Sequence, residues 1–98
     1  MNVARQEYAR RHDVYTLDAY AWSLHLNGQD AEARRQIEAA LAVGVRDART
    51  LHHAGEIALK LGDRAAAEHY LQDSAALNAP GSEQARVTLA ALMPQSQK

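Results

Sequence analysis

A repeat about 34 residues long constrains the fold of this chain more than any other feature of its sequence. When the 98-residue sequence is shifted against itself by about 34 positions, residues of the same kind coincide. The coinciding pairs are Asp13 with Asp47, Leu17 with Leu51, Gly28 with Gly62, Ala33 with Ala67, and Ile37 with Leu71. Because a repeat of this length accommodates two helices and a turn, the sequence predicts stacked helical hairpins.

The composition favours helices over sheets. The chain contains 21 alanines, no phenylalanine and only two prolines, which is typical of closely packed helices. A mass of 10.8 kDa is sufficient for one small domain only. We therefore predict a single all-α domain of five to six helices that spans residues 1–98.

Aspartates and glycines mark the expected ends of the helices. An aspartate before a helix accepts hydrogen bonds from its free amides, and a glycine after a helix adopts the left-handed conformation. Asp13, Asp47 and Asp63 are therefore expected as caps, Asp30 as the start of another helix, and Gly28, Gly44 and Gly62 as helix ends. This divides the chain into a leading helix 2–12, a repeat 14–47, a repeat 48–81 and a C-terminal capping helix 82–93, followed by a polar tail.

One stripe along the first helix of each repeat is apolar or small. Its members recur at spacings of three and four, so they are expected to face the partner helix. They are Leu17, Ala21 and Leu24 in the first repeat and Leu51, Ala54, Gly55 and Ala58 in the second, with Ile37, Leu41, Tyr70 and Leu71 from the second helices opposite them. Small residues at a helix contact allow the two backbones to approach closely, so we expect a larger residue at Gly55 to be destabilising.

This order of large and small positions resembles the tetratricopeptide repeat. The series Leu17, Ala21, Leu24, Gly28, Ala33, Ile37, Ala40 and its copy Leu51, Gly55, Ala58, Gly62, Ala67, Leu71, Ser74 carry the resemblance, which covers about residues 14–81. The chain departs from the family at Leu17 and Leu51, where tryptophan is frequent, at Asp30 and Arg64, where an aromatic residue is common, and in keeping only Pro80 between units. The resemblance implies a right-handed α-hairpin solenoid whose concave groove, lined by the first helices, binds peptides or partner helices.

A second stripe on the same first helices points away from the apolar stripe. It is polar with aromatic anchors, and such residues dominate the energetics of protein interfaces. We expect it to contact a protein or peptide partner of unknown identity; its members are Tyr15, Asp18, Trp22 and His25 in the first repeat and Arg49, His52 and Glu56 in the second. Alternatively, Tyr15 and Trp22 pack against a preceding helix around Val3 and Tyr8, and His52 with Glu56 forms only a solvated pair.

The best-known ligand mode of the family is a clamp of lysines and asparagines around the carboxylates of a chaperone tail. In this chain Asp18 and Trp22 stand where the clamp of the first repeat has lysine and asparagine. An aspartate there repels a carboxylate, so this ligand is disfavoured. A peptide of mixed apolar and charged character, or another helix, is expected instead.

Other function classes find little support in the sequence. Eleven basic and twelve acidic side chains give a net charge of −1, which argues against nucleic acid or an anionic membrane as the partner. The chain has no cysteine, no serine in a nucleophile motif and no glycine-rich phosphate loop. Among the histidines His12, His25, His52, His53 and His69, His52 stands four residues before Glu56 and could share a cation with it, but this pair lacks an obvious third ligand. We therefore expect no enzyme activity, no cofactor and no metal; the alternative is a metal site in which His25 joins His52 and Glu56.

Two further alternatives concern the ends of the chain. In the first, the leading segment resembles the second helix of a preceding repeat, and the natural protein extends beyond Met1. Alternatively, exposed terminal faces at Val3 and Tyr8, or at Leu89, Leu92 and Met93, mediate self-association. The sequence has no segment with the length and hydrophobicity of a membrane span or a secretory signal, which suggests a cytoplasmic location.

Overall fold

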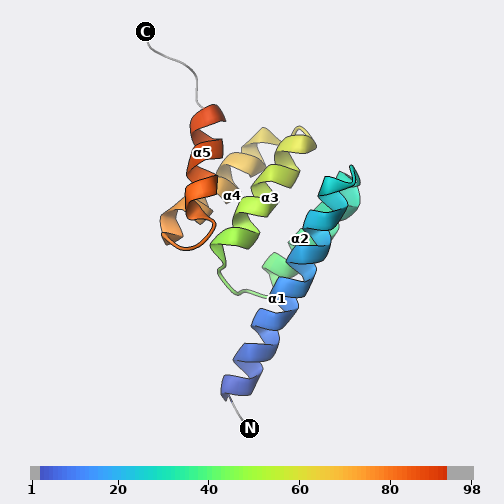
Figure 1. Cartoon of the computed structure of the whole chain (residues 1–98), viewed down its shortest axis with the longest axis vertical. Helices are drawn as coiled ribbons and strands as arrows, with labels where there is room; N and C mark the ends of the chain where they lie inside the picture. Colours follow the sequence, from blue (N-terminus) through green and yellow to red (C-terminus); the bar gives the residue numbers. More distant parts are fainter. Residues whose placement is uncertain (1–2, 93–98) are drawn as a thin grey trace.

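The computed structural model describes residues 3–92, with side chains from residue 9 onward. This part of the chain forms helices and turns without a strand, so the all-α prediction is confirmed. Figure 1 shows its five helices in order: α1 (Val3–Leu26), α2 (Asp30–Ala42), α3 (Ala48–Lys60), α4 (Arg64–Leu77) and α5 (Ser82–Leu92). None of these helices is both long enough and apolar enough to cross a membrane.

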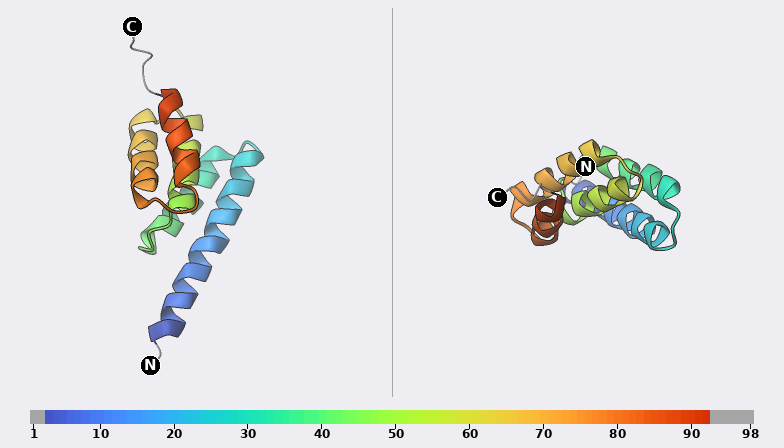
Figure 2. Two further views of the ribbon diagram at one scale, coloured as in Figure 1. Left: turned by 60° about the vertical axis from the view of Figure 1, so that its left-hand side comes forward. Right: turned by 90° about the horizontal axis from the view of Figure 1, so that it is seen from above.

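The helices form two layers. α1 packs against α2, and α3 packs against α4, so each pair is a helical hairpin. α3 also contacts α1 and α5, which places α1, α3 and α5 side by side with α2 and α4 behind them (Figure 1). Seen from above, the helices follow a shallow arch (right panel of Figure 2). The α1, α3 and α5 layer is therefore one continuous surface made mainly of the first helix of each predicted unit.

The predicted helix boundary at Asp13 is wrong. α1 runs without interruption from Val3 to Leu26, and Asp13 is an exposed residue within it rather than an N-terminal cap. Neither glycine nor proline precedes Asp13, whereas its counterpart Asp47 follows Gly44 and a short loop. An aspartate inside a helix costs less than about 0.7 kcal/mol, which is too little to end a helix without a breaker. The leading helix 2–12 is therefore the first part of α1.

The other predicted helix ends agree with the structure. Asp47 caps α3 by accepting hydrogen bonds from the Thr50 amide at 2.9 Å and from its hydroxyl at 2.8 Å. Asp63 caps α4 by accepting from the Ala66 amide at 3.2 Å. Asp30 begins α2 as expected, but the residue in the cap position is Gln29, whose side chain makes no capping hydrogen bond.

Removal of the α3 cap is expected to destabilise the domain. Asp47→Ala leaves the Thr50 amide and the buried Thr50 hydroxyl without their acceptor, and loss of such a cap costs about 1 kcal/mol. For a domain of this size the melting temperature then falls by roughly 4–8 °C. Asp13→Ala is the matched control, because a residue within a helix has no cap to lose; a comparable fall in that variant would contradict the continuous α1.

The core lies where the two hairpins meet. It contains Ala21 and Leu24 from α1, Ala33 and Ile37 from α2, and Ala54 and Ile57 from α3, with Leu41 and Tyr70 packed against it. Of the predicted apolar stripe, only Leu17 is an exception, because it is half-buried beside Val43. The buried residues near it on α1 are Val14 and Asp18. The buried side of α1 is therefore rotated about the helix axis, from the predicted apolar stripe toward the predicted polar stripe.

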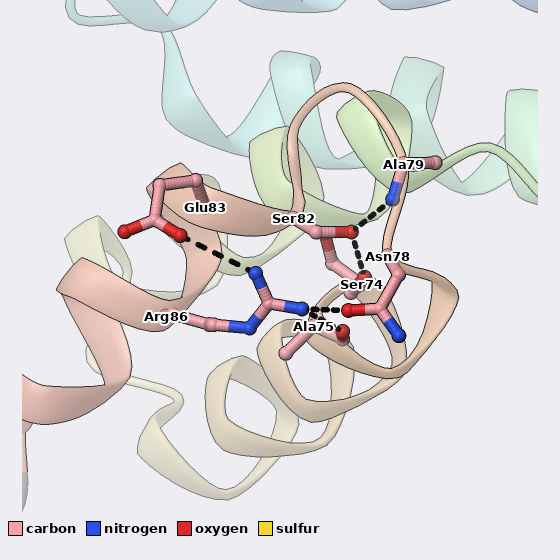
Figure 3. Close-up of polar contacts among 7 residues, drawn as sticks. All are labelled: Ser74, Ala75, Asn78, Ala79, Ser82, Glu83 and Arg86. Atoms are coloured by element: carbon pink, nitrogen blue, oxygen red, sulfur yellow. Dashed lines mark hydrogen bonds and ion pairs between the residues drawn. The ribbon is translucent and has the colours of Figure 1, made fainter.

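A buried polar network holds α5 against the rest of the molecule (Figure 3). The Ser82 hydroxyl donates to the Ser74 carbonyl at 2.6 Å and accepts from the Ala79 amide at 3.0 Å. The Ser74 hydroxyl donates to the Ala48 carbonyl at 2.7 Å, which ties α4 to the start of α3. Arg86 adds hydrogen bonds to the Ala75 carbonyl and to the Asn78 side chain. α5 therefore occupies a defined position beside α3.

Candidate functional site

The residues of the predicted polar stripe lie on one surface of the molecule, which we call the α1–α3 face. α1 supplies four of them and α3 supplies three. Because α1 and α3 pack side by side, the two half-stripes lie next to each other. The seven residues are Tyr15, Asp18, Trp22, His25, Arg49, His52 and Glu56.

Trp22 lies at the centre of this face, surrounded by imidazole rings. Its ring stacks on His53 with centroids 4.1 Å apart and an interplanar angle of 20°. The centroids of His25 and His52 lie 4.7 Å and 6.3 Å from it. Trp22 is therefore half-buried among histidines of α1 and α3. The predicted alternative, in which Tyr15 and Trp22 pack against a preceding helix around Val3 and Tyr8, is wrong, because all four residues belong to α1. Tyr8 lies roughly 21 Å from Trp22 along the helix axis.

Each of the three histidines is paired with a carboxylate. Nδ1 of His53 lies 2.7 Å from Asp18 Oδ1, Nδ1 of His25 lies 2.5 Å from Asp30 Oδ1, and Nε2 of His52 lies 3.1 Å from Glu56 Oε2. An ionised carboxylate only accepts hydrogen bonds, so these ring nitrogens carry the proton and donate it. The pairs fix the orientation of the rings that surround Trp22.

Asp18 differs from its predicted role. It was expected to contact a partner, but its side chain is buried, with 8% of its surface exposed. It holds His53 of the neighbouring helix instead. This pair joins α1 to α3, so Asp18 fixes the position of His53 within the α1–α3 face.

His53 is the residue of this face that the sequence analysis did not place there. It follows Asp18 by 35 positions, about the length of one repeat. In stacked hairpins, residues one repeat apart on first helices lie beside each other. The separation of Asp18 and His53 could therefore have predicted their contact. His53 was not assigned to the face because it lies between the two stripes predicted for this helix.

Glu56 connects the face to α5. The Thr88 hydroxyl of α5 donates to Glu56 Oε2 at 2.6 Å, and His52 shares the same oxygen. The hydrogen bond from His52 and, to a smaller extent, the one from Thr88 hold the pKa of Glu56 below its ordinary value against the opposing effect of burial. The ionised carboxylate is therefore the form that joins α3 to α5.

The lowered pKa of Glu56 predicts a stability that depends on pH. A carboxyl group with a depressed pKa in the folded state contributes stability above its unfolded pKa, about 4.3 for glutamate, and loses it as the pH falls through the lower folded value. We expect Glu56→Gln to lower the free energy of unfolding by about 1 kcal/mol at pH 7 and by less at pH 3.5, measured by urea denaturation. Glu83→Gln, at an exposed position, is the control. A Glu56→Gln effect that is equal at both pH values would contradict this role.

Three adjoining hollows extend the α1–α3 face onto α5. The aromatic hollow, of about 370 Å³, is lined by Tyr15, Asp18, Ala19, Trp22, Arg49 and His53. The turn hollow, of about 500 Å³, is lined by Arg49, His52, His53, Glu83, Gln84 and the turn residues Ala79, Pro80 and Gly81. The α5 hollow is lined by His52, Glu83, Gln84, Val87 and Thr88. From the sequence, α5 was predicted as a capping helix or a self-association face, whereas here it forms one wall of the surface.

Three further observations concern a metal site and the two ends of the chain. Among the side chains described, no three histidine or acidic groups are arranged to hold a metal ion. Of the terminal faces suggested for self-association, Leu89 and Leu92 are half-buried. The side chains of Val3 and Tyr8, and the whole of Met93, lie outside the described residues.

Comparisons with known proteins add no relative from which a function can be transferred. Neither the known family models, nor the curated proteins, nor the solved structures give a significant match to this chain.

Proposed function

We propose that this chain is a non-catalytic protein-interaction module that binds a peptide or a partner helix on its α1–α3 face. The observation that carries the proposal is the gathering of Tyr15, Trp22 and Arg49 around one open hollow. Residues of these three types contribute most to protein interfaces, because they bury a large area with few rotatable bonds and keep a polar group.

The proposed architecture is a right-handed, tetratricopeptide-like solenoid of α-hairpins. Three features support it: the repeat in the sequence, the packing of α1 with α2 and of α3 with α4, and the single layer formed by α1, α3 and α5. In such a solenoid the layer of first helices lines the concave side. A ligand on that side contacts several units at once.

The packing around Trp22 favours binding over a purely structural role. The indole is held by His25, His52 and His53, yet it also lines the aromatic hollow. A side chain that is already ordered loses little conformational entropy when a partner covers it. The nearby Tyr15 is 52% exposed and available for contact.

Affinity capture from a lysate of the source organism tests this proposal. We expect the wild-type domain to retain a protein that the triple variant Tyr15→Ala, Trp22→Ala, Arg49→Ala loses. A matched triple variant, Tyr20→Ala, Leu26→Ala, Arg35→Ala, removes an aromatic, an apolar and an arginine side chain that are exposed elsewhere.

The control variant should retain the same protein as the wild type. Circular dichroism must show that all three proteins are equally helical. Loss of the protein from both variants, or retention by both, would contradict the assignment of the α1–α3 face.

A further inference from the structure

We infer that the partner segment carries an aspartate or glutamate side chain between apolar residues, and that Arg49 binds this carboxylate. The inference rests on the proposed function and specifies the ligand of the same surface. Three features point to this ligand: the position of Arg49, the pairing of the carboxylates around it, and the apolar groups in the adjoining hollows.

Arg49 lies where the aromatic hollow and the turn hollow meet, and it lines both of them. Its backbone is fixed by the turn before α5, because a Cβ at Gly81 would lie only 2.6 Å from Arg49 Cα. Among the described residues, none forms a hydrogen bond or an ion pair with its side chain, which is exposed. A guanidinium in this position offers a planar pair of donors that matches a carboxylate.

The carboxylates around Arg49 have partners other than Arg49. Asp18 is hydrogen-bonded to His53, Glu56 is hydrogen-bonded to His52 and Thr88, and Glu83 forms an ion pair with Arg86. Arg49 is therefore the charged side chain of this group that these pairs leave without a partner. A ligand that is complementary to this surface supplies a negative group at this place.

Apolar surface lies in the hollows at both ends of this surface. The aromatic hollow, which Arg49 lines, presents Tyr15, Ala19 and Trp22. Beyond the turn hollow, the α5 hollow presents Val87, a residue that is 62% exposed. A segment with an acidic residue flanked by apolar ones matches this order of groups.

Selection from a random dodecapeptide library, displayed with blocked C-termini, tests the inference on the whole chain. The wild type is expected to enrich peptides with an aspartate or glutamate between apolar residues. Arg49→Glu is expected to enrich lysine or arginine at that place instead. Arg35→Glu, which changes an exposed arginine on α2, should select the same peptides as the wild type.

A synthetic copy of the best wild-type peptide then measures the contact itself. Replacing its acidic residue by the corresponding amide should weaken binding to the wild type roughly tenfold or more, but binding to Arg49→Gln less than about twofold. An equal loss with both proteins would overturn the role of Arg49.

The outcomes separate the inference from the proposed function. Peptides enriched without an acidic residue, or the same acidic peptides selected by Arg49→Glu, would overturn the inference and leave a peptide-binding face. Enrichment that depends on neither Tyr15 nor Trp22, or no enrichment by the wild type, would count against both.

Discussion

Ile57→Ala is expected to cause the largest loss of stability of any single substitution discussed for this domain. The Ile57 side chain is fully buried in the core that joins α3 to the α1–α2 hairpin. Truncation of a buried isoleucine to alanine costs about 3 kcal/mol, because it removes apolar contacts and leaves a cavity. The melting temperature should fall by roughly 12–24 °C, measured by circular dichroism or calorimetry.

The shape of the unfolding transition carries additional information. Because Ile57 belongs to one hairpin and packs into the other, both should unfold together in one transition. Leu26→Ala removes a leucine that is 69% exposed and should change the free energy of unfolding by less than about 0.5 kcal/mol. Two separate transitions in the wild type, or a small effect of Ile57→Ala, would contradict the shared core.

Gly55→Leu is expected to destabilise the domain through overpacking. A Cβ at Gly55 would lie 2.6 Å from both Cγ and Cδ2 of Leu71, which is itself fully buried. Because the Cβ alone already overlaps Leu71, a larger residue forces α3 and α4 to separate or Leu71 to leave its rotamer. We expect a loss of about 2 kcal/mol in the free energy of unfolding, measured by urea denaturation.

Ala39→Leu is the control for Gly55→Leu. Ala39 is exposed on α2, so the same leucine there meets solvent and should leave stability within about 0.5 kcal/mol of the wild type. If Gly55→Leu were as stable as this control, the close approach of α3 and α4 at Gly55 would be refuted.

Most of the fold was predictable because its signals are local. The cap at Asp47, the glycine ends at Gly28 and Gly62, and the spacing of small residues each depend on a few neighbouring positions. The exception is Asp13, which has the residue type of a cap but lacks a helix breaker before it. Cap preference alone is too weak to decide whether a helix ends.

The candidate site was predictable in its position but not in its internal pairing. Helical spacing together with the repeat of about 34 residues was sufficient to place Tyr15, Trp22 and Arg49 on one surface. The burial of Asp18 and the contact of His53 with Trp22 depend on how α1 rotates against α3, which is fixed by the packed core. Rotation of a helix by a fraction of a turn exchanges a solvent-facing residue for a buried one. The periodicity within one helix does not determine this rotation relative to its neighbour.

The most direct test of the proposed interaction surface is photocrosslinking from two tyrosine positions of α1. Tyr15 and Tyr20 are equally exposed, each at 52%, but only Tyr15 lines the aromatic hollow. A photoreactive phenylalanine analogue is introduced at one position or the other, and the domain is irradiated in a lysate of the source organism. The two probes therefore lie on different parts of the surface of α1, but the side chains that they replace are equally accessible to solvent.

We expect the probe at position 15 to form a discrete crosslink to a partner protein that the probe at position 20 does not form. A crosslink of position 15 to a second copy of this chain would instead identify the face as a self-association surface. Crosslinking of the same partner from position 20 alone, or equally from both positions, would contradict the claim that the α1–α3 face is where this domain binds.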